Sequence, residues 1–114
     1  MALGAKARQV GSVAILDLSG KITLGENAGV LRDEFKVLLA GGYKNILLNL
    51  AGVSYVDSAG LGELVGAYTT AANAGAKVKL VNLQSKMQDL LQITKLHTVF
   101  EIFDNEQAAI ASCA

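Results

Sequence analysis

Residues 45–62 read NILLNLAGVSYVDSAGLG, in which an apolar run leads through a short polar connection into a helical pattern. The apolar run, Ile46 to Leu50, is typical of a strand that is buried on both faces of a sheet. Asp57 and Ser58 follow the connection and open the helical pattern. The segment therefore predicts a strand, a turn and a helix, with a serine hydroxyl at the turn.

Ser58 lies where this helix begins, and the position favours negative charge. The first N–H groups of a helix have no partner inside it, and the helix dipole adds partial positive charge there. A phosphate on Ser58 would therefore be tolerated by the fold and visible to a partner. The local sequence alone favours a simpler role, in which Ser58 is the N-cap and stabilises the helix by ~1 kcal/mol. Asp57 is the alternative cap, which would leave the Ser58 hydroxyl facing outward.

Two glycines follow in the first turns of the same helix. Gly60 and Gly62 each cost about 1 kcal/mol relative to alanine inside a helix, so their presence needs a reason. One reason is close packing against the neighbouring strand. The other is a surface kept low so that a partner can approach. The sequence leaves both explanations open.

Composition points to one compact domain over residues 1–114, with 52% hydrophobic residues. Ten basic residues balance ten acidic ones, so no nucleic-acid or membrane footprint is expected. The single cysteine cannot form an internal disulfide, and no signal-peptide pattern precedes the first strand, so we expect a cytoplasmic protein. No carboxylates, histidine or nucleophile form a recognisable catalytic set, so we expect no enzymatic activity.

Periodicity and turn residues predict the other elements: a β-hairpin over Ala7–Ser19, a helix over Ala28–Leu39, a strand over Lys77–Leu83, a helix with Met87 and Leu91 on its buried face, a strand over Val99–Phe103 and a last helix through Ile110. Ser85 with Gln88, and Asp104 with Gln107, predict capping boxes at the last two helices. Strands and helices alternate after residue 25, which favours parallel pairing, and the hairpin makes the sheet mixed.

Several single residues carry simpler expectations. Lys77 and Lys79 are expected on a solvated strand face, and Tyr55 is expected to be half-buried by packing. Asn49 is expected to satisfy backbone groups at the end of its strand. His97 has no Cys, Asp or Glu at metal-ligand spacing, so a solvated or capping histidine is expected.

The order β-β-α-β-α-β-α-β-α and the Asp-Ser-Ala-Gly-Leu-Gly motif at residues 57–62 resemble the STAS domain of bacterial anti-sigma factor antagonists. The resemblance covers nearly the whole chain and includes Leu16–Ile22, Leu90–Leu96 and Phe100–Ala108. It implies an α/β STAS fold, with a mixed sheet of about five strands and four helices.

The resemblance also implies a function as a phosphorylation-switched binding module. Such proteins bind an anti-sigma factor, often a serine kinase of the GHKL type, and sequester it while they are unphosphorylated. The kinase phosphorylates the motif serine, here Ser58, and a PP2C-type phosphatase reverses the modification. No cofactor is implied. The expected partner surface combines the loop after the second strand with the start of the helix: Thr23, Leu24, Gly25, Glu26, Asn27, Asp57, Ser58, Ala59, Gly60, Gly62 and Glu63.

The chain departs from the family pattern at a few positions. Asn49 stands where relatives often carry aspartate, Ala51 where they often carry serine, and Glu26 where many have an aspartate or a pair of polar groups. These departures bear on the identity of the partner more than on the fold. The alternative is an unphosphorylated sensor of small ligands or nucleotides, or a scaffold subunit. A monomer or weak dimer is expected.

Overall fold

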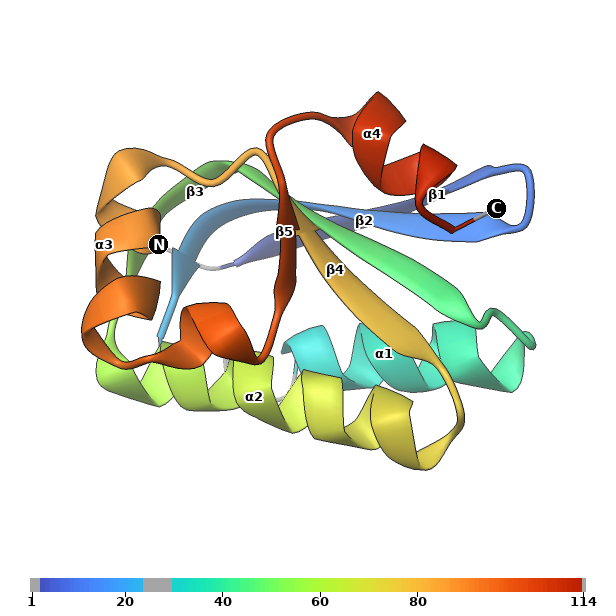
Figure 1. Ribbon diagram of the computed structural model, residues 1–114. Coiled ribbons are helices and arrows are strands. Elements are labelled where there is room, and N and C mark those ends of the chain that lie inside the picture. Colours follow the sequence, from blue (N-terminus) through green and yellow to red (C-terminus); the bar gives the residue numbers. More distant parts are fainter. Residues whose placement is uncertain (1–2, 24–29, 114) are drawn as a thin grey trace.

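The computed structural model describes residues 3–23 and 30–113, and within them five strands form one mixed sheet (Figure 1). The strands, in their order across the sheet, are β1 (Gly4–Val10), β2 (Val13–Ile22), β3 (Asn45–Val56), β4 (Lys77–Val81) and β5 (Glu101–Phe103). The helices are α1 (Val30–Ala40), α2 (Ser58–Asn73), α3 (Ser85–Ile93) and α4 (Glu106–Ala111), with a 3₁₀ turn, η1, at Leu96–Thr98. β1 is antiparallel to β2 and the remaining pairs are parallel, which confirms the predicted α/β order.

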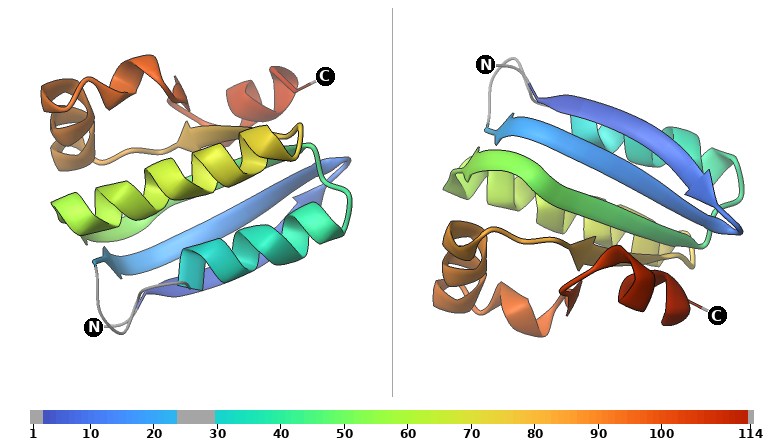
Figure 2. Two further views of the ribbon diagram at one scale, coloured as in Figure 1. Left: turned by 90° about the horizontal axis from the view of Figure 1, so that it is seen from below. Right: turned by 90° about the horizontal axis from the view of Figure 1, so that it is seen from above.

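The helices divide between the two faces of the sheet. Helices α1 and α2 lie side by side across one face, whereas α4 lies on the other (Figures 1 and 2). Helix α3 lies at the end of the sheet where β3 finishes and α2 begins (Figure 1). Loops that leave the carboxyl ends of parallel strands gather at this end.

Alternation along the strands supplies both faces with apolar side chains. In β2, Leu16 belongs to the main core beneath α1 and α2, with Phe35 and Leu64. Its neighbour Ile15 points to the opposite face and packs with Leu47 and other residues of a smaller cluster beneath α4. All five side chains are fully buried, so the sheet is covered on both faces at its centre.

Strand β3 is longer than predicted. It continues past Leu50 to Val56, through residues that the sequence suggested were a connection. The pairing with β2 explains the extension, because Gly52 lies opposite Ser19 and Val56 opposite Ile22. The other neighbour, β4, pairs with β3 only as far as Asn49. The last part of β3 is therefore flanked by a strand on one side only.

Both predicted capping boxes are wrong. The N-cap of α3 is Gln84, which makes no side-chain capping bond, and Ser85 is already inside the helix. Gln88 Nε2 instead donates to the Leu83 carbonyl at 3.2 Å. The N-cap of α4 is Asn105, whose Oδ1 accepts from the Ala108 N–H at 2.8 Å. Asp104 and Asn105 are both good capping residues, so the sequence pattern predicted the start of this helix one residue too early.

Lys79 does not lie on a solvated face as predicted. It is 4% exposed, because α4 and the residues after it cover this side of β4. Its ammonium donates to Ser112 Oγ at 2.7 Å and lies 3.1 Å from Glu101 Oε2. Lys77 is exposed, as expected. Tyr55 was expected to be half-buried, but it is 53% exposed because its half of β3 has no strand beyond it.

Asn49 joins a polar network on the α4 face rather than simply ending its strand. Its Oδ1 accepts from the backbone N–H of Ala51, which agrees with the expected role of satisfying a backbone group. The same oxygen also accepts from Asn82 Nδ2. Its Nδ2 donates to Asp17 Oδ1 at 2.8 Å. The hydrogen bond from Arg8 and the one from Asn49 both hold the pKa of Asp17 below its ordinary value. An aspartate at position 49 would place a second carboxylate against Asp17, so the amide suits this site.

Candidate functional site: the turn between β3 and α2

Asp57 anchors the turn from β3 into α2. Its side-chain Oδ1 accepts from the Gly60 N–H at 2.7 Å, which makes Asp57 the N-cap of the helix. Its own backbone N–H donates to the Ile22 carbonyl at 3.4 Å, at the end of β2. The turn is thus tied to two elements, and of the two caps considered above the structure selects Asp57.

Ser58 is the first residue of α2, and its side chain is exposed. Its hydroxyl makes no hydrogen bond with any of the residues that the structure describes. The capping role belongs to the preceding residue, so the hydroxyl is open to solvent at the positive end of a helix dipole. Without a hydrogen-bonded base the hydroxyl is a weak nucleophile, so any chemistry at Ser58 requires an external enzyme.

Of the two explanations for the glycines, close packing against the neighbouring strand holds for Gly60 but not for Gly62. A Cβ on Gly60 would lie 1.7 Å from the Ile22 carbonyl oxygen, so only glycine lets the helix approach β2 this closely. A Cβ on Gly62 would meet no described residue within 4 Å, and Gly62 is exposed. Gly60 is therefore required for close packing, whereas Gly62 leaves the surface beside Ser58 without a projecting side chain.

Only part of the predicted partner surface lies within the described residues. Thr23 follows β2 directly, and the Asp57–Ile22 bond places it beside the Ser58 turn. The predicted contact residues of the loop after Thr23, which are Leu24, Gly25, Glu26 and Asn27, lie outside the described residues. Ala59 is half-buried at the start of α2.

Glu63 turns toward α1 rather than toward solvent. Its side chain is 11% exposed, and its Oε2 lies 3.7 Å from Arg32 Nη2. A partner approaching the start of α2 would therefore meet the guanidinium of Arg32, which is 54% exposed, more readily than the Glu63 carboxylate. Local sequence patterns do not reveal this pair, because the two residues lie on different helices.

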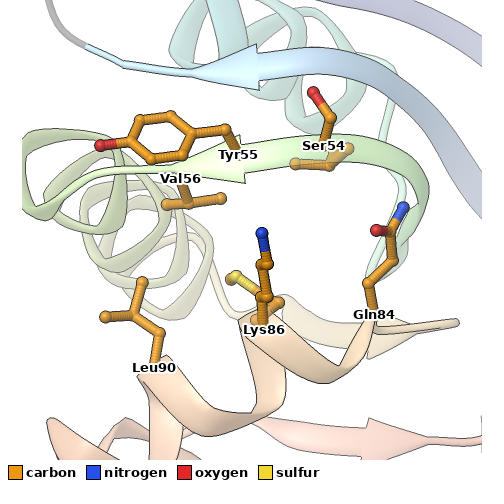
Figure 3. A pocket seen from close by; sticks show the side chains of 8 residues that line it. Ser54, Tyr55, Val56, Gln84, Lys86 and Leu90 are labelled. Carbon is orange, nitrogen blue, oxygen red and sulfur yellow. The ribbon is translucent and has the colours of Figure 1, made fainter.

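A pocket that the sequence did not predict lies between the last part of β3 and α3 (Figure 3). Its volume is about 170 Å³. Eight of the described residues line it: Val53, Ser54, Tyr55, Val56, Gln84, Lys86, Met87 and Leu90. The wall on β3 ends one residue before Asp57, so the pocket adjoins the Ser58 turn. It was missed because its β3 wall was interpreted as a connection, although two β-branched valines there favour a strand.

Over residues 3–23 and 30–113, no group of three or more His, Cys, Asp or Glu side chains is arranged to hold a metal ion. In the same part of the chain, no helix has the length and apolar character needed to span a bilayer.

The sequence matches the STAS domain model over residues 5–109. It is 30% identical over 95 residues to the anti-sigma-B factor antagonist of Bacillus subtilis, an alignment that covers 83% of this chain and 85% of that protein.

Solved structures show the same fold. A Thermotoga maritima protein assigned to the anti-sigma factor antagonists matches with a TM-score of 0.85 and 28% identity, over 95% of this chain and 92% of that one. The Bacillus cell fate determinant SpoIIAA in its phosphorylated form matches with a TM-score of 0.72, over 97% of this chain and 100% of that one. At 18% identity the second match shows the fold alone. The chain therefore belongs to the STAS domain family and, within it, to the anti-sigma factor antagonists, which are regulators rather than enzymes.

Proposed function

We propose that this protein binds an anti-sigma factor through the surface around the β3–α2 turn, and that phosphorylation of Ser58 ends the binding. The observation that carries the proposal is the Ser58 hydroxyl, which is exposed at a helix N-terminus and not used as a cap. Asp57 performs the structural task of the turn. Ser58 can therefore be modified without loss of the bond that begins the helix.

The physical basis of the switch is local charge. A phosphoserine carries about −1.5 to −2 charge at pH 7. In a close interface this charge must lose water, and it would lie beside the Asp57 carboxylate, so affinity for a partner that fits the unmodified surface falls. Within the domain, the N-terminus of α2 offsets part of the added charge. The fold is therefore retained while the complex dissociates.

The proposed partner is an anti-sigma factor that is itself a serine kinase of the GHKL type, with a PP2C-type phosphatase to restore Ser58. The names of the relatives support an anti-sigma factor as partner, and a Bacillus protein of the same fold has been solved in a phosphorylated form. We place this exchange in the cytoplasm, where the sigma factor acts. The contact surface would combine Thr23–Asn27 with the first turns of α2 up to Gly62.

The site of modification is tested by incubating the protein with its kinase and ATP, followed by intact-mass and fragment spectra. We expect a single phosphate on Ser58 and none on the Ser58→Ala variant. Thr69 and Ser85 are matched controls, because both are exposed hydroxyl residues within helices. A phosphate on either of them, with Ser58 unmodified, would contradict the proposal.

The effect of the charge is tested by calorimetric titration of the anti-sigma factor with wild type, Ser58→Asp and Ser58→Ala. We expect Ser58→Asp to bind at least about tenfold more weakly, since an uncompensated charge at an interface costs a few kcal/mol. Ser58→Ala should bind like wild type. Melting curves must show that both variants remain folded. Because aspartate carries less charge than phosphoserine, the phosphorylated protein itself is the decisive sample, and undiminished affinity after phosphorylation would refute the switch.

A further inference from the structure

The pocket between β3 and α3 combines apolar walls with one cation. Val53, Val56, Met87 and Leu90 supply the hydrophobic surface, and none of its eight lining residues is acidic. Lys86 is the only charged residue among them. Figure 3 shows the Lys86 and Leu90 side chains rising from α3 toward β3, with the Lys86 ammonium in the space between the two elements.

Among the described residues, Lys86 has no counter-ion. Its ammonium forms no ion pair or hydrogen bond with any residue in the described part of the chain. The buried Lys79, by contrast, is paired with Glu101 and Ser112. An anion that entered the pocket would therefore gain a partner for its charge without displacing an existing one.

The beginning of α3 adds to the positive character of the pocket. Its N-cap residue, Gln84, makes no side-chain capping bond. Gln84 Nε2 donates instead to the Ala51 carbonyl of β3 at 2.8 Å, and this bond closes one end of the pocket. No described side chain accepts a hydrogen bond from the N–H groups of the first turn, and the helix dipole favours negative charge nearby.

The size of the pocket sets the size of the ligand. An apolar cavity of about 150 Å³ accommodates a benzene molecule. At about 170 Å³, this pocket has room for one ring or a short branched chain, with an acidic group directed to its mouth. We infer that the β3–α3 pocket is a binding site for a small carboxylate with an apolar body, whose charge is met by Lys86. This inference does not rest on the proposed phosphorylation of Ser58.

Benzoate is a suitable probe, with benzamide as its neutral analogue. Titration of the ¹⁵N-labelled protein, followed by heteronuclear NMR, reports both the affinity and the location of binding. For a ligand of this size we expect a benzoate Kd of about 1 mM. The shifting resonances should be those of Val53–Val56 and Gln84–Leu90. Benzoate should bind about fivefold more tightly than benzamide, the advantage that one exposed ion pair can supply.

The Lys86→Ala variant tests the cation, and Lys77→Ala is its matched control. Lys77 is also exposed, but it lies at the other end of β4, away from this pocket. We expect Lys86→Ala to bind benzoate and benzamide equally, and Lys77→Ala to behave like wild type. Leu90→Trp, which fills the pocket from α3, should weaken the binding of both probes.

Three results would overturn the inference. The first is the absence of saturable shifts at about 20 mM benzoate, well above the expected Kd. The second is shifts that cluster on another part of the fold. The third is a benzoate preference that survives Lys86→Ala or is lost equally in Lys77→Ala. The lysine comparison stands even if Leu90→Trp fails to fold, because exposed lysines can be replaced with little effect on stability.

Discussion

The turn between β3 and α2 has an inner side that attaches the helix to β2 and an outer side that faces solvent. The two sides are formed by residues that alternate over a short stretch of sequence. On the inner side, Asp57 caps the helix and Gly60 lets it touch the Ile22 carbonyl of β2. On the outer side, Ser58 and Gly62 are exposed, the Ser58 hydroxyl has no hydrogen bond to a described residue, and a Cβ at Gly62 would meet none of them within 4 Å. Within six residues, the residues that attach the helix to the sheet are thus different from the residue that exposes a hydroxyl to solvent. If Ser58 is phosphorylated as proposed, we expect this separation to leave the fold intact.

The largest effect should follow from adding one methyl group on the inner side. Gly60→Ala puts a Cβ 1.7 Å from the backbone oxygen of Ile22, a residue that is buried. Either α2 or the end of β2 must move, which we expect to cost about 3 kcal/mol or more of unfolding free energy. Urea unfolding of Gly60→Ala measures this cost.

Gly62→Ala is the matched control, because the same substitution is made two residues along the same helix. No described residue lies within 4 Å of the added Cβ, so alanine should stabilise by up to about 1 kcal/mol through helix propensity. Equal effects of the two substitutions would show that the inner and outer sides do not differ as described.

Asp57→Ala should have the next largest effect on stability. It removes the acceptor for the Gly60 N–H and should cost about 1 kcal/mol, a typical value for loss of an N-cap. Asp57→Asn retains an acceptor oxygen and should restore most of the loss. Chemical denaturation of the three proteins makes the comparison. If Asp57→Asn is as unstable as Asp57→Ala, then the negative charge near the helix dipole matters more than the hydrogen bond.

Gly62→Arg should separate binding from stability. The side chain projects into open space, so the unfolding free energy should stay within about 1 kcal/mol of wild type. Affinity for the anti-sigma factor should fall, because a bulky side chain beside Ser58 keeps a close partner away. Lys77→Glu, at the other end of the sheet, is the control for surface charge and should bind normally. If Lys77→Glu loses binding and Gly62→Arg does not, the partner docks elsewhere.

The sequence predicted the order of the elements and the location of the turn, because both depend on local patterns. Hydrophobic periodicity and glycines mark where helices and strands begin and end. It could not choose between Asp57 and Ser58 as the cap, since both residue types are good caps and only the backbone geometry decides. It left the two glycines undecided for a similar reason, because the oxygen that excludes a Cβ at Gly60 belongs to residue 22.

Apart from the two capping boxes, the failures of the sequence analysis involve contacts between distant segments. Lys79 looked solvated because nothing in its strand indicates that α4 returns to cover it. The second half of β3 looked like a connection because its pairing with β2 is not encoded locally. The pocket beneath it was missed as a consequence, since its walls are two segments about thirty residues apart in the chain.

Ser58→Ala is expected to change the unfolding free energy least, and it tests the outer side of the turn most directly. The hydroxyl has no hydrogen-bond partner among the described residues, and alanine is a better helix former than serine. The unfolding free energy should therefore change by no more than about 0.5 kcal/mol. Denaturant titration of Ser58→Ala beside Asp57→Ala decides whether the two neighbours differ. A loss of ~1 kcal/mol for Ser58→Ala would mean that Ser58 shares the capping role. Phosphorylation would then remove a structural bond as well as add charge, and the modified protein would melt below the unmodified one.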